Sequence, residues 1–151
     1  MANTQAMCTS FKGELLVGHH NFGTGVTRGS TAADTFKAAL YLASATVNAS
    51  TTAFSATNEV SGTGYTSGGV TVTFATAPST SGTTAFVTPS ASITYTTVTL
   101  STAFDAVLIY NSTQSNKAVS VHTFGSQTVT AGTFTLTMPV NDASTGLIRL
   151  A

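Results

Sequence analysis

The three histidines of this chain have side chains that could bind a metal. His19 and His20 are adjacent, and His122 lies far along the chain in a stretch that reads as a strand. Neighbouring residues of an extended chain point to opposite faces, so the adjacent pair is poorly placed to bind one ion. Further ligands would have to come from a few scattered carboxylates. We therefore expect no metal site, and no cofactor.

The acidic residues and serines could in principle support hydrolysis. The acids are Glu14, Asp34, Glu59, Asp105 and Asp142. None of them lies close to another in the sequence, which argues against a pair of catalytic carboxylates. The serines are numerous, but none lies in a G-x-S-x-G turn between a strand and a helix. The chain is therefore not expected to be an enzyme.

A glycine-rich segment, GTGYTSGG, spans Gly62 to Gly69. A phosphate-binding loop requires a Gly-Lys-Ser/Thr sequence that opens a helix. This segment has no lysine and leads directly into a stretch that alternates like a strand, so phosphate binding is disfavoured. The glycines instead predict a turn or bulge with positive φ angles.

Pairs of threonines separated by one residue recur along the chain. Examples are Thr94 with Thr96 and Thr135 with Thr137. Flat threonine arrays of this kind bind ice when they repeat at a constant period, but here the spacing is irregular. Because apolar residues occupy the intervening positions, the pairs are interpreted as the solvent-facing side of amphipathic strands.

The composition is almost free of charge. Charged residues make up 7% of the 151 residues and the net charge is zero, whereas about 25% is usual. Lysine and arginine occur singly, so no basic patch is available for nucleic acid, and nucleic acid is not an expected partner. A neutral, hydroxyl-rich surface provides little charge repulsion between copies, which suits a protein that works in an assembly.

The sequence gives only weak signals for secretion, membrane insertion or disulfide formation. A secretory leader consists of a basic stretch followed by an apolar stretch, and the sequence shows no such pattern. No segment approaches the roughly 20 apolar residues of a membrane helix, so no membrane association is expected. The single cysteine, Cys8, is interpreted as a small apolar side chain in an N-terminal segment, with an intermolecular disulfide or a reactive thiol as less favoured alternatives.

The elements that must position these residues read as strands separated by Gly, Ser, Thr and Asn turns. Residues 34–45 would tolerate a helix, but their alternation favours a strand. The alternation changes phase within 93–100, which predicts a β-bulge. Residues 103–110 are almost continuously apolar, as in a central strand. Further alternating stretches cover 70–74, 119–123, 134–138 and 147–150. We expect an antiparallel β-sandwich, jelly-roll-like or immunoglobulin-like, with the strand order left open.

Residues 1–30 differ from the rest in their lack of alternation. We interpret them as an N-terminal arm with one short strand, attached to a β-sandwich domain of residues 31–151. The arm could reach a neighbouring subunit, or it could fold over its own domain as a long loop. In the first case it would supply intersubunit or capsid contacts. The candidate contact residues are Phe11, Leu15, Leu16, His19, His20 and Phe22.

Several sequence segments, taken together, resemble small structural proteins of tailed bacteriophages. They are FKGELLVGHHNF (Phe11–Phe22), DTFKAALYLASATVNASTTAFSATNEVSGTGYTSGGVTV (Asp34–Val72), AVLIYNSTQSNKAVSVHTFG (Ala106–Gly125) and GTFTLTMPVNDASTGLIRL (Gly132–Leu150). The resemblance covers most of the chain and is more specific than any one motif within it. It supplies no catalytic residues.

The resemblance implies a virion component made in the host bacterial cytoplasm. The expected role is that of a capsid decoration, or cement, protein on the capsid surface, where it would bind the major capsid protein lattice and stabilise the head. Such proteins are commonly homo-oligomers, and a trimer is expected here. The alternatives are a tail, neck or head-fibre component, and a carbohydrate- or receptor-binding β-sandwich.

Overall fold

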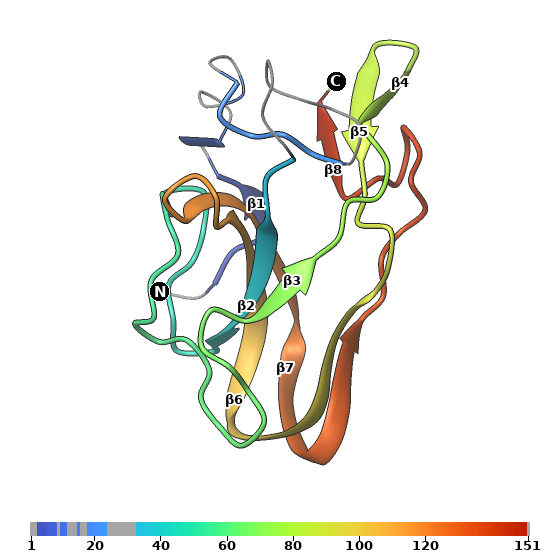
Figure 1. Ribbon diagram of the computed structural model, residues 1–151. Coiled ribbons are helices and arrows are strands. Elements are labelled where there is room, and N and C mark those ends of the chain that lie inside the picture. Colours follow the sequence, from blue (N-terminus) through green and yellow to red (C-terminus); the bar gives the residue numbers. More distant parts are fainter. Residues whose placement is uncertain (1–2, 9, 12–14, 16–17, 24–32, 151) are drawn as a thin grey trace.

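The computed structural model describes residues 3–8, 10–11, 15, 18–23 and 33–150 (Figure 1). Eight strands have defined bounds in this part of the chain. They are β1 (Ala6–Met7), β2 (Phe36–Leu42), β3 (Val70–Val72), β4 (Ser79–Ser81), β5 (Thr84–Val87), β6 (Ile93–Asn111), β7 (Lys117–Leu136) and β8 (Ile148–Leu150). The larger sheet has the order β1-β7-β6-β2-β3 and the smaller sheet the order β4-β5-β8, with every neighbouring pair antiparallel. The predicted all-β class, with two antiparallel sheets, is confirmed.

β2 and the second half of β6 form the centre of the larger sheet. The segment with the helix-compatible composition is strand β2, which pairs with β6 along its whole length. Ala38, Leu40, Val107 and Leu108 are almost completely buried. Burial on both faces explains the continuous apolar run at residues 103–110, and the prediction of a central strand there is confirmed.

β6 and β7 form one long ribbon that bends back on itself. At the lower end of Figure 1 both strands turn together and run upward again. The register shifts several times between Tyr95 and Ala106, and Thr97 and Ala131 adopt positive φ angles of 54° and 45°. The predicted bulge is thus confirmed. The sequence suggested several shorter strands here, because each inserted residue moves the apolar positions to the other face and interrupts the alternation.

The smaller sheet contains a hairpin that the alternation did not predict. β4 and β5 are joined at Gly82, whose φ is +58°. β4 consists only of exposed Ser and Thr residues, so it has no alternation of apolar and polar side chains to reveal it. The C-terminal strand β8 completes this sheet beside β5.

The described residues near the N-terminus belong to the same core as the rest of the chain. β1 pairs with β7, and Cys8 is completely buried. The side chain of Asn3 donates to the carbonyl of Leu42 and to Asp105, and its oxygen accepts from the amide of Val47. These contacts fix the start of the chain to the larger sheet.

Candidate functional site

The candidate contact residues of the N-terminal segment lie largely inside the protein. Phe11, His20 and Phe22 are 0%, 9% and 5% exposed. Leu15 is half-buried against the core and His19 is also half-buried, whereas Leu16 lies outside the described residues. In the described part of this segment, the chain therefore folds over its own domain. The expectation that the segment contacts a neighbouring subunit remains a prediction.

An aromatic cluster joins this segment to the larger sheet. The rings of Phe22 and Phe36 stack with centroids 4.5 Å apart, and Phe74 meets both rings edge-on. Phe11 meets His20 edge-on at 4.7 Å. Aromatic pairs of this geometry add to the stabilisation from apolar burial. The cluster makes the N-terminal segment an integral part of the fold.

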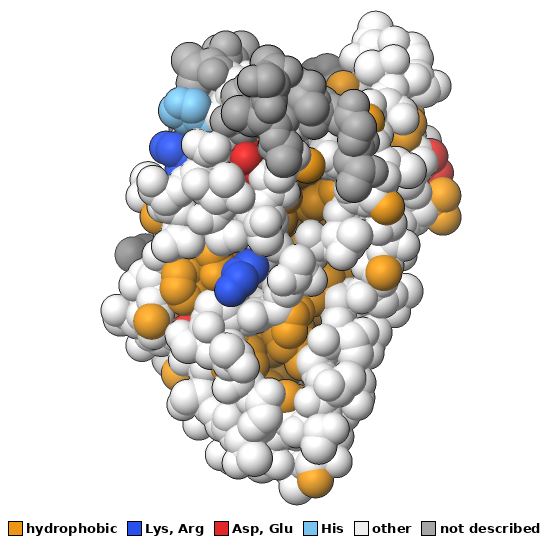
Figure 2. Space-filling view, viewed as in Figure 1, with side chains coloured by type: hydrophobic (Ala, Val, Ile, Leu, Met, Phe, Trp, Pro, Cys, Tyr) orange, Lys and Arg blue, Asp and Glu red, His pale blue; other side chains and the backbone are white. Residues whose placement is uncertain are grey.

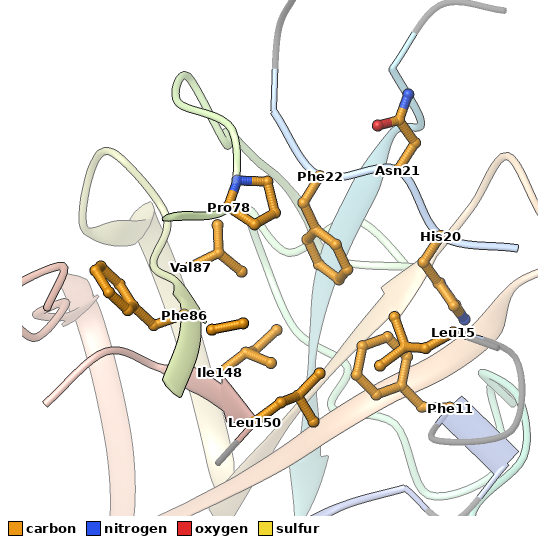
Figure 3. A pocket seen from close by; sticks show the side chains of 11 residues that line it. Phe11, Leu15, His20, Asn21, Phe22, Pro78, Phe86, Val87, Ile148 and Leu150 are labelled. Atoms are coloured by element: carbon orange, nitrogen blue, oxygen red, sulfur yellow. The ribbon is translucent and has the colours of Figure 1, made fainter. Parts of the chain in front are cut away.

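A hollow of about 210 Å³ lies between this cluster and the smaller sheet. Phe22 from the N-terminal segment faces Val87 and Ile148 across it (Figure 3). Its walls are mainly apolar, and its polar side chains, His20 and Asn21, come from the same segment. The described lining is therefore an apolar surface with His20 and Asn21 as its polar side chains.

The polar side of His20 is held by a buried hydrogen-bond network. Asn111 is completely buried, and its side-chain nitrogen lies 3.1 Å from His20 Nδ1 and 2.7 Å from Asp34 Oδ2. The same carboxylate oxygen accepts from the backbone amide of Asn21. The oxygen of Asn111 accepts from the amides of Thr113 and Gln114 in the β6–β7 turn. The network thus connects the N-terminal segment to the central strands.

The glycine-rich segment belongs to a long loop, residues 43–69, between β2 and β3. Gly64, Gly68 and Gly69 have φ angles of +78°, +88° and +71°, which confirms the predicted positive φ angles. The loop also approaches other backbone closely: a Cβ atom on Gly62 would lie 2.1 Å from the carbonyl oxygen of Thr99. The glycines therefore serve to pack the loop tightly against β2 and β6.

Glu59 is the polar centre of this loop and is only 8% exposed. One carboxylate oxygen accepts from the Tyr65 hydroxyl at 2.9 Å and from the Gly68 amide at 2.7 Å. The other accepts from the Ser67 hydroxyl at 2.6 Å. A buried carboxylate is tolerated when donors satisfy it in this way. The sequence showed Glu59 only as an isolated acid, because its three donors become neighbours through the turn at Gly62–Gly69.

All four tyrosines use their hydroxyl groups to fix this loop or the adjacent strands. Tyr41 donates to the carbonyl of Ser55, Tyr95 to that of Ala38 and Tyr110 to that of Gly68. Tyr65 donates to Glu59 and accepts from the amide of Leu40. Burial raises the pKa of Tyr41 to about 12 and also raises the pKa of each of the other three. The negative charge of Glu59 adds to the increase in all four.

The raised tyrosine pKa values predict a loss of stability in alkali. A tyrosine in an unfolded chain has a pKa of about 10, so the unfolded state releases its protons first as the pH rises. The contribution of the tyrosines to stability should be constant below about pH 10 and should fall as the pH rises towards the folded-state values, with Tyr41 alone contributing of order 2 kcal/mol by pH 12. Urea unfolding as a function of pH measures the loss, and tyrosinate absorbance measures ionisation. Ionisation at the ordinary pKa in the folded protein would contradict the prediction.

His122 is the third of the histidines considered as metal ligands, and its ring contacts a neighbouring side chain on β7. The Ser120 hydroxyl lies 2.9 Å from His122 Nε2, and burial lowers the pKa of His122 to about 4. A histidine with so low a pKa is a weak base at neutral pH. Ser120 is 3% exposed, so substrate cannot readily reach its hydroxyl. The pair is best understood as a buried hydroxyl and a half-buried imidazole that satisfy each other.

The described residues offer no cluster typical of a metal site. Within residues 3–8, 10–11, 15, 18–23 and 33–150, no three His, Cys, Asp or Glu side chains come close enough to hold an ion. Within the same residues, no helix is long and apolar enough to cross a membrane.

Comparisons with known proteins identify no relative of this chain. No protein-family model, no curated protein and no solved structure matches it.

Proposed function

We propose that this chain is a structural protein of a bacteriophage virion, namely a capsid decoration protein that binds the major capsid protein lattice and stabilises the head. The proposal has two parts. The structural role is argued from the use that the fold makes of its polar side chains. The virion setting is argued from the resemblance of most of the chain to small structural proteins of tailed phages.

The structural role rests on one observation. The acidic and histidine side chains that were considered for catalysis or metal binding form hydrogen bonds that stabilise the fold. Asp34 bonds to Asn111, Glu59 bonds to the glycine-rich loop, and His122 bonds to Ser120. A catalytic group, by contrast, must lie within hydrogen-bond reach of a substrate. Side chains used in this way support a rigid protein that acts through the contacts of its surface.

The composition of the surface also supports a role in a lattice. A decoration protein loses water from two surfaces, one that meets its own copies and one that meets the shell. Removing water from a hydroxyl group costs much less than removing it from an unpaired charge. A chain with 7% charged residues can therefore bury much of its surface against neighbouring copies and against the shell at a low cost of desolvation.

The copy number in purified phage particles tests the proposal. We expect mass spectrometry of intact particles to find this chain in a number comparable to the major capsid protein, since a decoration protein occupies repeated positions on the shell. A small fixed number per particle would instead assign it to the tail or neck. Absence from particles that contain all other structural proteins of the same phage would overturn the virion role.

A further inference from the structure

Asn111 is the centre of the buried network that joins the N-terminal segment to the larger sheet, and its amide group has only one possible orientation. Its oxygen accepts from the backbone amides of Thr113 and Gln114, each at 3.1 Å. Its nitrogen donates to Asp34 Oδ2 at 2.7 Å. In the reversed orientation, the nitrogen would face two N–H donors and the oxygen would face a carboxylate. The side-chain nitrogen must therefore point towards Asp34 and His20.

This orientation fixes the protonation state of His20. The Asn111 nitrogen lies 3.1 Å from His20 Nδ1, and an amide nitrogen can only donate a hydrogen bond. His20 Nδ1 must therefore accept, so it carries no proton, and the neutral ring holds its single proton on Nε2. A second proton, on Nδ1, would place two N–H donors against each other and break the contact. The folded arrangement thus accommodates neutral His20 but not the charged form.

The surroundings of the His20 ring act in the same direction. The residue is 9% exposed, and its ring packs among those of Phe11, Phe22 and Phe36. Removing a charged group from water into such surroundings is costly. Burial therefore adds to the preference for the neutral ring that the Asn111 contact imposes.

The described titratable groups around His20 carry opposing charges. The Asp34 carboxylate shares the Asn111 nitrogen with His20, and its negative charge favours a charged ring. Lys117 lies opposite Asn111 in the β6–β7 register, and His19 precedes His20 in the chain. A positive charge on either of these two residues disfavours a charged ring. Because these influences oppose one another, the direction of the Asn111 donor decides which form of His20 the folded protein holds.

We propose that His20 is a pH-sensitive latch, which holds residues 18–23 against the larger sheet while the ring is neutral and releases them when the ring is protonated. A histidine in an unfolded segment takes up its proton near pH 6.5. Opening the segment frees the ring to bind that proton, so a fall in pH below about 6.5 shifts the equilibrium towards the open form. The inference concerns this segment alone and does not rest on the virion role.

Release of the segment would open the apolar hollow beside the smaller sheet. Phe22 faces Val87 and Ile148 across that hollow (Figure 3). The ring contacts of Phe22 with Phe36 and Phe74 would also be lost. At mildly acidic pH, the latch would therefore expose apolar surface that the protein buries at neutral pH. In the space-filling view, the same switch would change which side chains meet the solvent around this end of the molecule (Figure 2).

Hydrogen exchange at the latch tests the proposal. The Asn21 amide donates to Asp34 Oδ2, and the Asp34 amide donates to the carbonyl of Asn21, so both are protected while the segment is docked. We expect their protection factors to fall about tenfold between pH 7.5 and 5.5, as follows from a proton that binds only the open form near pH 6.5. The Val60 amide, which donates to the carbonyl of Leu40 outside the latch, should keep its protection.

Two results of this experiment would overturn the proposal. Constant protection of Asn21 and Asp34 over this pH range would show that the segment is not released. An equal loss of protection at Val60 would show that acid unfolds the whole domain instead of opening one segment.

Substitutions of the two adjacent histidines assign the response. His20→Asn removes the titrating ring, while its side-chain oxygen can still accept from Asn111, so the protection of Asn21 should no longer change between pH 7.5 and 5.5. His19→Asn is the matched control, with the same substitution one residue earlier, and should retain the tenfold change. A response that persists in His20→Asn, or that disappears in His19→Asn, would contradict the latch.

Nitrogen-15 NMR of the histidine rings tests the latch in the unmodified protein, whether or not the variants fold. At pH 7.5, His20 Nδ1 should show the chemical shift of an unprotonated nitrogen and Nε2 that of an N–H group. A proton on Nδ1 at this pH would refute the orientation of Asn111 and the latch together.

Discussion

Replacing Gly69 with alanine is expected to destabilise the protein by more than about 3 kcal/mol, which is a large part of the 5–15 kcal/mol typical of a folded domain. A Cβ atom at this position would lie 1.7 Å from the carbonyl oxygen of Ala38 and 2.8 Å from the Cα atom of Ala39. Both contacts are with backbone of the central strand β2, so no side-chain rotation can relieve them. The φ of +71° adds a cost of about 1 kcal/mol for any residue with a side chain.

Gly82→Ala separates the two causes of this loss. Gly82 has a similar φ of +58°, but no atom lies within 4 Å of the position that its Cβ atom would occupy. It should therefore show only the conformational cost of about 1 kcal/mol. Urea unfolding followed by circular dichroism measures both variants. Equal losses in the two would show that Gly69 does not approach β2 as closely as described.

The different roles of the glycines show how far the sequence could predict this loop. The GTGYTSGG pattern was sufficient to predict positive φ angles, because glycine is the residue that adopts them without strain. It could not predict the requirement at Gly62, where the restricting atom is the carbonyl oxygen of Thr99 on β6. Such a contact depends on how the loop folds back over the sheet, which no local pattern encodes.

The same distinction applies to the strands and to the aromatic cluster. Alternation was sufficient to predict β2, the bulge in β6 and the central position of residues 103–110, since each depends on which face is buried. It did not show that β6 and β7 are continuous through their bulges. Nor could it decide whether Phe11 and Phe22 would face a neighbour or their own core, because an apolar side chain is suited equally well to either surface.

Replacing Glu59 with alanine is the second substitution expected to have a large effect, with a loss of about 3–5 kcal/mol. The change removes the acceptor of three hydrogen bonds and leaves the Gly68 amide and two hydroxyl groups without their partner. The site is nearly inaccessible to solvent, so water cannot easily replace the carboxylate. Glu59→Gln should cost less, about 2 kcal/mol, because the remaining oxygen can still accept from Tyr65 and Gly68, while the charge-assisted bond from Ser67 is replaced by a weaker one from the amide nitrogen to the Ser67 hydroxyl.

A carboxylate near the surface with the same number of donors supplies the control. Asp142 Oδ1 accepts from the amides of Ser144 and Thr145 and from the Thr145 hydroxyl, and these hydrogen bonds lie at the surface, where Asp142 itself is only half-buried. Asp142→Ala should therefore be far less destabilising than Glu59→Ala, because water can satisfy the released donors. Urea unfolding gives the comparison, and hydrogen exchange at the Gly68 amide should become faster only in the Glu59 variants. Equal losses of stability would mean that Glu59 is not the buried centre of the loop.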